Sequence, residues 1–308
     1  MKSILKIGTR ESELAVWQAT LVQTFLKETG FLSELVYIKS EGDVDTVTPL
    51  YELGVQGIFT KALDTALLNN KIDIAVHSMK DVPTQLAVGI RQAAVLKRAS
   101  YKDIFVYKRD KDFLGDKYSA ATIATSSIRR KAQWLHRYPN HAFENLRGNV
   151  NTRLRKVNEN DWNGAIFAAA GLERINIRPK NSVDLDWMLP APAQGAIIIV
   201  CREDDEISFD ACKNFNDVDT ALCTKMERDF LRTLLGGCST PISALAEVKD
   251  EKIFFKGNIC SADGKEKIEV EKETLVQNSE QLGVDCGNEI LKDPKAQSII
   301  QIIRNEKE

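Results

Sequence analysis

"IDIAVHSMKDVP", residues 72–83, decides the fold, because an apolar segment of strand length runs directly into a turn of charged residues. The continuous apolar run lacks the spacing of a surface helix and indicates a buried strand. Residues 4–9 ("ILKIGT") and 34–39 ("ELVYIK") have the same strand character, and helical spacing over 11–29 and 57–70 separates the three. Strands that alternate with helices predict a mainly parallel sheet covered by helices on both faces.

A second unit repeats this pattern. Strand-like segments at 121–127, 142–148 and 164–171 are separated by two helical segments, the first stopped by Pro139 and the second spanning 149–160. Each strand leads into a polar turn that opens a helix. We therefore expect two α/β lobes of the same kind.

The pattern changes after about residue 218. A helix over 219–235 precedes three strand-like stretches, which predicts a small α+β domain with an antiparallel sheet. These stretches are 242–248, 252–260 and 267–273. The run "AIIIVC" (196–201) indicates one more buried strand. We expect this strand to join the sheet of the first lobe.

A chain of 308 residues exceeds the length at which a single core stops growing. We expect three domains: residues 1–98 together with 195–216, residues 99–194, and residues 217–308.

Composition narrows the class of protein. The N-terminus lacks a signal-peptide core, and no apolar run is long enough to span a bilayer, so we expect a cytoplasmic protein. The 6 cysteines all lie after residue 200 without a C-x-x-C pair, and none of the 3 histidines is near them in sequence, so we expect neither a metal site nor a disulfide framework. Most of these thiols should be buried small hydrophobes. Cys238 differs, because the loop "LLGGCSTP" (234–241) presents it after two bare glycines.

The formal net charge of −2 hides one basic region. Residues 129–156 contain Arg129, Arg130, Lys131, Arg137, Arg147, Arg153, Arg155 and Lys156, but only one acid, Glu144. Such a region forms either a solvated basic surface, which could bind nucleic acid, or an anion site.

The polar turns favour the anion site, because each follows a predicted buried strand and such turns meet at one edge of a parallel sheet. The turns carry Arg10 and Ser12; Ser78, Lys80 and Asp81; Ser126, Ser127, Arg129 and Arg130; and Arg147 and Arg153. Guanidinium groups bind carboxylates and phosphates through paired N–H donors, and Ser126 and Ser127 are expected to cap a helix. The alternative is a set of charged, helix-capping surface loops. His77 is expected to be a structural residue at the end of its strand.

Two nucleotide-binding patterns are absent from the sequence. It contains no G-x-x-x-x-G-K-[ST] segment, and "GVQGIF" does not have the G-x-G-x-x-G pattern. The expected anion is therefore not held by either of these loops.

Seven motifs occur in one order along the chain. They are "RESELA" (10–15), "HSMKDVP" (77–83), "TSSIRR" (125–130), "LRGNVNTR" (146–153), "AAAGLERI" (168–175), "LPAPAQGA" (189–196) and "GGCSTP" (236–241). Together they resemble the porphobilinogen deaminase family over residues 4 to about 245.

The resemblance implies a three-domain transferase whose first two domains are similar to the halves of periplasmic binding proteins. Such enzymes join four porphobilinogen molecules head to tail, release ammonia each time, and yield linear hydroxymethylbilane for porphyrin biosynthesis. Their cofactor is a dipyrromethane, held by a thioether to the cysteine that matches Cys238. A monomer that acts on this small molecule, without nucleic acid or membrane, is the family expectation.

The resemblance also implies residue roles. Asp81 would be catalytic, holding pyrrole N–H groups and stabilising the cation left when ammonia departs. The cofactor would contact Cys238, Ser78, Lys80, Ser126, Ser127, Arg129, Arg130, Arg147 and Arg153. The substrate carboxylates would contact Arg10, Ser12, Arg147, Arg153 and Arg174.

Three positions depart from the family pattern. Gln56 replaces a common lysine, Ala193 replaces a usual glycine where the chain crosses between domains, and Thr240 replaces a usual valine. We expect Gln56 to weaken either loop closure or substrate binding, Ala193 to stiffen a hinge, and Thr240 to be neutral. The main alternative function is a non-catalytic protein that captures a small anion between two lobes.

Overall fold

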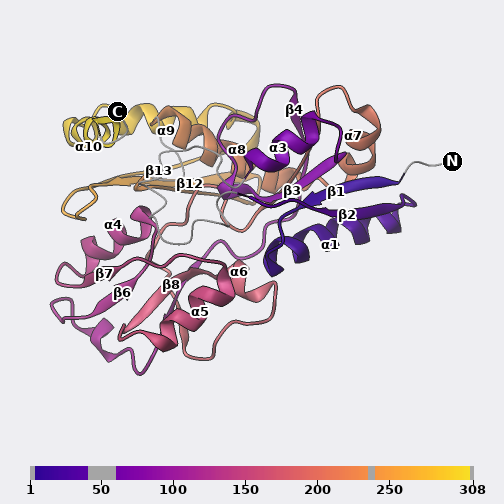
Figure 1. Cartoon of the computed structure of the whole chain (residues 1–308). Coiled ribbons are helices and arrows are strands. Elements are labelled where there is room, and N and C mark those ends of the chain that lie inside the picture. The colour runs from indigo at the N-terminus through magenta and orange to yellow at the C-terminus, as the bar shows by residue number, and fades with distance from the viewer. Residues whose placement is uncertain (1–3, 41–59, 235–239, 306–308) are drawn as a thin grey trace.

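Three β-sheets organise the chain (Figure 1). The computed structural model describes residues 4–40, 60–234 and 240–305. Two sheets have five strands each and are mainly parallel, and the third has three antiparallel strands. The predicted fold class of two α/β lobes and a C-terminal α+β unit is confirmed.

The first sheet has the order β2-β1-β3-β10-β4. Its strands are β1 (Leu5–Thr9), β2 (Ser33–Tyr37), β3 (Ile74–Ser78), β4 (Ile90–Val95) and β10 (Ile197–Arg202). Strand β10 confirms the predicted return of "AIIIVC", and it runs antiparallel to both of its neighbours. Helices α1 (Glu13–Glu28) and α7 (Glu206–Cys212) cover one face, and α3 (Lys61–Leu68) covers the other.

The second sheet has the order β7-β6-β8-β5-β9. Its strands are β5 (Asp103–Tyr107), β6 (Thr122–Ala124), β7 (Ala142–Glu144), β8 (Gly164–Ala168) and β9 (Ser182–Asp184). Helices α5 (Val150–Glu159) and α6 (Ala169–Glu173) cover one face, and α4 (Ile128–Arg137) covers the other. The antiparallel strand β5 occupies the same place in this sheet as β10 does in the first.

Each of these sheets therefore contains one strand that arrives from the other lobe. The chain crosses from β4 into β5, and later from β9 back into β10. Because both crossings lie beside the turns that follow the parallel strands, they bring polar groups from the two lobes together.

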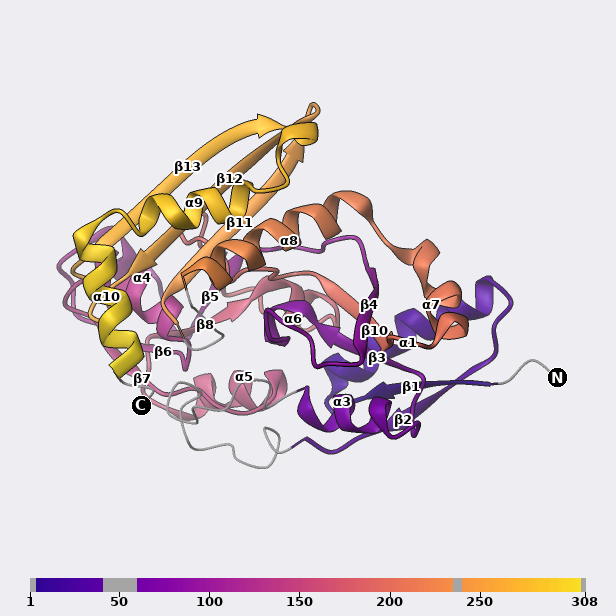
Figure 2. The ribbon, with the colours of Figure 1, turned by 90° about the horizontal axis from the view of Figure 1, so that it is seen from above.

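The C-terminal unit is built on β11 (Ile242–Lys249), β12 (Lys252–Cys260) and β13 (Lys267–Leu275). Helices α8 (Val218–Thr233), α9 (Leu282–Ile290) and α10 (Pro294–Asn305) share one apolar core with this sheet. Figure 2 shows α8 lying between the antiparallel sheet and the first lobe. Short 3-10 turns complete the described chain at Met79–Asp81, Asp112–Gly115, Lys213–Phe215 and Val276–Asn278.

Candidate active site

The turn that follows β3 is held at both ends by buried apolar residues. Met79 and Val82 are buried, the Met79 N–H donates to the Ala196 carbonyl at 3.0 Å, and the Val82 N–H donates to the Met79 carbonyl at 3.2 Å. Between them, Lys80 and Asp81 are half-buried. The sequence folds in this way because the apolar residues enter the core while the charged residues between them cannot.

Ser78 contributes a hydroxyl beside this turn. Gln18 Nε2, from the buried side of α1, donates to Ser78 Oγ at 2.9 Å. The hydroxyl keeps its own hydrogen for another acceptor, because it serves as the acceptor in this contact.

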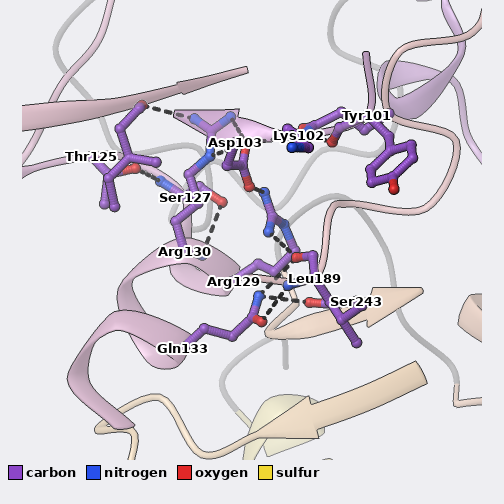
Figure 3. A network of polar contacts seen from close by, with 12 residues as sticks. Tyr101, Lys102, Asp103, Thr125, Ser127, Arg129, Arg130, Gln133, Leu189 and Ser243 are labelled. Carbon is purple, nitrogen blue, oxygen red and sulfur yellow. Dashed lines mark hydrogen bonds and ion pairs between the residues drawn. The ribbon is translucent and has the colours of Figure 1, made fainter. Parts of the chain in front are cut away.

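Asp103, the first residue of β5, is the centre of a buried ionic network in the second lobe (Figure 3). Its carboxylate is fully buried, and Arg129 Nη2 donates to Oδ2 at 2.7 Å. Arg130 donates to Oδ1 from Nη2 at 2.7 Å and from Nε at 3.1 Å. Although burial alone would raise the pKa of Asp103, the two guanidinium groups hold it far below its usual range.

Arg129 and Arg130 therefore do not project freely from the start of α4. Arg129 Nη1 also donates to the Leu189 carbonyl at 2.6 Å, and Arg130 Nη1 donates to the Ile166 carbonyl at 3.0 Å. Both side chains are buried. Asp103 offsets one of their two charges, so together they present about one net positive charge.

Gln194 links this network to the turn of the first lobe. Its buried amide Nε2 donates to Asp103 Oδ1 at 2.9 Å and to the Tyr101 carbonyl at 2.7 Å. Because both acceptors require the nitrogen on that side, Oε1 faces Lys80 and accepts from its Nζ at 3.3 Å. A single glutamine on the second crossing thus connects Lys80 with Asp103.

Lys80 lies in the combined field of both lobes. Burial lowers its pKa to about 8, Asp81 and Asp103 act to raise it, and Arg130 and Arg129 lower it further. These contributions place the ammonium group close to the start of α4 as well as to its own turn.

Arg153 belongs to the same cluster. Its Nε donates to the Gly148 carbonyl at 2.7 Å, and burial followed by Arg130 and Arg147 lowers its pKa to about 10. Asp81 acts in the opposite direction. Gly148, at a φ of 109°, makes a tight turn before α5.

Arg147 and the two serines lie on the turns that precede α5 and α4. Arg147 is buried, and Ser126 Oγ donates to the Leu146 carbonyl at 2.9 Å. Ser127 is the N-cap of α4 and accepts from the Arg130 N–H at 3.5 Å. The expectation that both serines cap the helix is therefore wrong for Ser126, whose hydroxyl ties two turns together instead.

Arg10 and Ser12 lie at the end of β1. Ser12 is the N-cap of α1, but its side chain makes no capping hydrogen bond. Arg10 acts electrostatically on His77 and on Arg153, so it faces the cluster. Burial and then Arg10 lower the pKa of His77 to about 4, which leaves this imidazole neutral at pH 7.

Arg174 reaches between the lobes from just beyond α6. Its Nη2 donates to the Gly195 carbonyl at 2.7 Å, and its guanidinium lies 5.8 Å from the centre of the Trp17 ring. Burial lowers its pKa to about 10.

Cys238 and Gln56 lie outside the described residues. Leu234 and Thr240, on either side of the Gly-Gly-Cys segment, are both buried. The other five cysteines are buried free thiols, as expected.

The basic region 129–156 is buried at three of its members, whereas Arg137 and Arg155 are exposed. Arg129, Arg130 and Arg147 are only 5%, 6% and 2% exposed. The buried members are placed to meet a small anion enclosed between the turns.

Comparison with known proteins decides the family. Residues 5–209 match the model for porphobilinogen deaminase, dipyromethane cofactor binding domain, and residues 221–292 match the porphobilinogen deaminase C-terminal domain. The chain belongs to the porphobilinogen deaminase family. The porphobilinogen deaminase of Chlorobium phaeobacteroides is 39% identical over 98% of this chain and 99% of its own, and that of Syntrophotalea carbinolica is 40% identical over 94% and 93%.

A more distant likeness concerns shape alone. A nutrient binding protein from Burkholderia cenocepacia bound to methionine aligns with 70% of this porphobilinogen deaminase family chain and 93% of its own, with a TM-score of 0.43 and 17% identity.

The site fits the cofactor that the family model names. A dipyrromethane made from porphobilinogen carries acetate and propionate side chains, and the lowered pKa values of Lys80 and Arg153 indicate buried positive charge that nearby carboxylates offset only in part. Additional carboxylates would complete this charge balance.

Three residues of the site were missed from the sequence. Asp103, Gln194 and Arg228 act through partners that are distant along the chain. A possible signal for Asp103 was an acid placed directly before the apolar run "IFVY". Gln194 lies in the quoted motif "LPAPAQGA", but no role was assigned to it, and Arg228 had no comparable local signal.

Proposed function

We propose that Asp81 is the catalytic group and that the cationic turns around it hold the carboxylates of cofactor and substrate. The activity itself follows from the family: the chain is a transferase that condenses four porphobilinogen molecules head to tail into hydroxymethylbilane, with release of ammonia, in tetrapyrrole biosynthesis. The observation that carries the residue assignment is the hydrogen-bonded chain from Lys80, beside Asp81, through Gln194 to Asp103 and Arg130 of the second lobe.

Asp81 suits its role because an ionised carboxylate only accepts hydrogen bonds. It can receive pyrrole N–H groups, and its charge opposes the positive charge that develops on the substrate as ammonia leaves. We also assign to Asp81 the proton transfers: its carboxylate takes the proton from the attacked ring carbon, and the carboxylic acid so formed can return that proton to the amine that departs in the next condensation.

The surrounding cations bind and orient carboxylates. Arg10, Arg147, Arg153, Arg174 and Lys80 can each meet a carboxylate, with hydroxyl donors from Ser12 and Ser78. Arg129 and Arg130 contribute only the N–H groups that Asp103 and the two carbonyls leave available. Ser126 and Ser127 support the turn, and we assign them to cofactor contacts.

The cofactor is a dipyrromethane, which when bound supplies the pyrrole carbon from which the product is extended. We assign its attachment to Cys238, since the other five cysteines are buried in apolar cores. Burial raises the pKa of Cys212, Cys223, Cys260 and Cys286 to about 12, which suppresses their thiolate forms.

The remaining assignments concern the oligomeric state, the location in the cell, nucleic-acid binding and the domain boundaries. We propose a monomeric cytoplasmic enzyme that does not bind nucleic acid, with domain boundaries near the two crossings, at 98/99 and 194/195, and at 216/217. Free buried thiols agree with a reducing compartment. None of the helices in the described ranges could cross a bilayer.

One experiment tests the site. Asp81→Asn, Cys238→Ala and the control Asp161→Asn, which changes an exposed aspartate far from the cluster, are compared by turnover and by intact mass. Asp81→Asn should lose on the order of 10²-fold or more in turnover while circular dichroism shows a native fold. Cys238→Ala should lack the added dipyrromethane mass, and Asp161→Asn should match the wild type.

Two results would contradict the assignment. Near-normal turnover by Asp81→Asn would remove the catalytic role, and an adduct that persists in Cys238→Ala would place the attachment elsewhere. A wild-type protein that neither carries nor acquires the adduct from porphobilinogen would instead support the anion-capturing alternative.

A further inference from the structure

Arg228, on helix α8 of the C-terminal unit, hydrogen-bonds the turn that carries Asp81. Its Nη1 donates to the Val82 carbonyl at 2.9 Å and to the Met79 carbonyl at 3.3 Å, and its Nη2 donates to the Pro83 carbonyl. These contacts join positions that are about 145 residues apart in sequence. One guanidinium group thus donates hydrogen bonds to backbone carbonyls on both sides of Asp81.

Backbone carbonyls in this turn depend on such a partner. After β3 ends at Ser78, the turn leaves the sheet, and its carbonyls no longer have a neighbouring strand to bond. A planar guanidinium carries five N–H donors in a fixed geometry, so it can satisfy several carbonyls and define their directions. Lysine has the same charge but no rigid fork.

The turn is thereby fixed at two places that flank Asp81. Before it, the Met79 N–H bonds the Ala196 carbonyl at the start of β10. After it, the carbonyls of Val82 and Pro83 bond Arg228. Without Arg228, the part of the turn after Asp81 would be held by the burial of Val82 and its N–H bond to Met79 alone.

Helix α8 is itself held rigidly at this point. The carboxylate of Glu227, the residue before Arg228, is fully buried. It accepts from Arg98 Nη1 at 2.6 Å, from the Ala193 N–H at 2.6 Å and from the Ala246 N–H at 2.8 Å. The position of α8 relative to both crossings is therefore set one residue away from the contact with the turn.

We propose that Arg228 is a positioning residue for Asp81. It holds the catalytic carboxylate in place through backbone carbonyls, and it fixes that carboxylate to the helix that leads to Cys238. The inference rests on the catalytic role proposed for Asp81. A displacement of about 1 Å at a reacting group can cost on the order of 10²-fold in rate, so the effect should be large.

The test compares Arg228→Met and Arg228→Lys with Arg232→Met. Arg232 is a matched control, because it lies one turn further along α8, is 51% exposed and pairs with Asp229 at 2.9 Å. Hydrogen exchange of a peptide covering residues 74–86 in the holoenzyme reports on the turn directly. Steady-state kinetics with porphobilinogen separate kcat from KM.

We expect faster exchange over residues 74–86 in both Arg228 variants, since lysine cannot bridge the three carbonyls. We also expect kcat to fall on the order of 10²-fold for Arg228→Met, with KM changed less than about threefold, because all the proposed carboxylate-binding cations except Lys80 lie on other turns. Arg232→Met should match the wild type in both measurements.

Two outcomes would overturn the proposal. Wild-type exchange together with wild-type kcat would mean that Arg228 does not set the turn. A raised KM at unchanged kcat would mean that Arg228 binds substrate itself. Failure of the underlying function is distinguishable, because Asp81→Asn would then turn over normally while Arg228→Met would still exchange faster.

Discussion

Ala193 adopts a backbone conformation that alanine disfavours. Its φ is 62°, in the left-handed region, and its methyl group is fully buried beside the second crossing. The family's usual glycine has no such penalty, which for other residues is roughly 1–2 kcal/mol. The Ala193 N–H donates to Glu227, so the conformation is held by the same buried carboxylate that fixes α8; we call this carboxylate and its partners the Glu227 joint.

Replacing Ala193 with glycine should therefore be nearly neutral. The variant loses a buried methyl group and gains chain entropy, but it relieves the left-handed strain. Ala196→Gly also removes a buried methyl group. Ala196 is not among the described residues with a positive φ, so this change relieves no strain. Urea unfolding should show Ala196→Gly to be less stable than Ala193→Gly by about 1–2 kcal/mol; equal stabilities would show that Ala193 is unstrained.

Lys80 predicts a pH dependence for cofactor uptake. Its pKa is lowered to about 8, with Asp81, Asp103, Arg129 and Arg130 as the charged groups facing it. The ammonium form attracts carboxylates, and it is fully present well below pH 8 and lost as pH rises through that value. The rate at which the apoenzyme gains dipyrromethane mass should fall above about pH 8.

Lys80→Arg provides the control, because arginine stays charged over this range. Its uptake rate should lack the fall near pH 8. An identical fall in both proteins would assign that titration to another group, such as the amine of the substrate.

Single residues also show where sequence reasoning stops. Lys80 and Asp81 were predictable because a polar turn after a buried strand has a local pattern. Asp103 was not, because its burial depends on Arg129 and Arg130, which approach it from another element. The sequence therefore predicted a field of free cations, whereas the structure neutralises part of it.

At the scale of elements, the turn between β12 and β13 docks on helix α4. The Gly264 carbonyl accepts a hydrogen bond from His136 Nδ1 at 2.8 Å, and Gly264 has a φ of 73°. A Cβ at this position would lie 2.5 Å from the backbone nitrogen of His136 and 2.7 Å from the carbonyl oxygen of Ala132. Only glycine permits this approach of the hairpin to the helix backbone.

Gly264→Ala should therefore separate the hairpin from α4. We expect a loss of about 2 kcal/mol or more, from left-handed strain and from the backbone clash. Gly115→Ala is the matched control, since a Cβ there has no neighbour within 4 Å. Thermal unfolding should show a clear loss only for Gly264→Ala, and equal melting temperatures would mean that the hairpin is not docked.

Several strands were predicted well, both where the segment is continuously apolar, as in β10, and where charged residues interrupt it, as in β13. The three C-terminal strands and β10 lie within two residues of their predicted bounds. Strands β4 and β5 were not predicted, because the short apolar runs around Ile90 and Ile104 follow no turn-to-helix pattern. The direction of β10 was not predictable either, since periodicity shows burial and not which neighbour a strand meets.

At the scale of the whole molecule, Glu227 joins all three units. Its carboxylate binds Arg98 on the first crossing, the Ala193 N–H on the second, and the Ala246 N–H of β11. Removing one partner of a buried ion pair typically costs about 3–5 kcal/mol. The joint should therefore control both stability and cooperativity.

Glu227→Gln should destabilise the protein by about 3 kcal/mol and uncouple the C-terminal unit. All 4 tryptophans lie in the first two lobes, so their fluorescence reports on these lobes while far-UV circular dichroism reports on the whole chain. The two urea transitions should coincide in the wild type and separate in Glu227→Gln. Glu247→Gln, which changes a half-exposed carboxylate, is the control; coincident transitions in Glu227→Gln would refute the role of the joint.

The exchange of β5 and β10 between the first two sheets has a consequence for how this chain can be divided. A fragment that stops before residue 195 would lack β10, which sits between β3 and β4, so β4 would have no neighbour in the sheet. A fragment that begins after β5 would lose the strand between β8 and β9 in the same way. Neither lobe is a portable module, and a premature stop near the middle of the gene would leave an incomplete sheet with exposed edges.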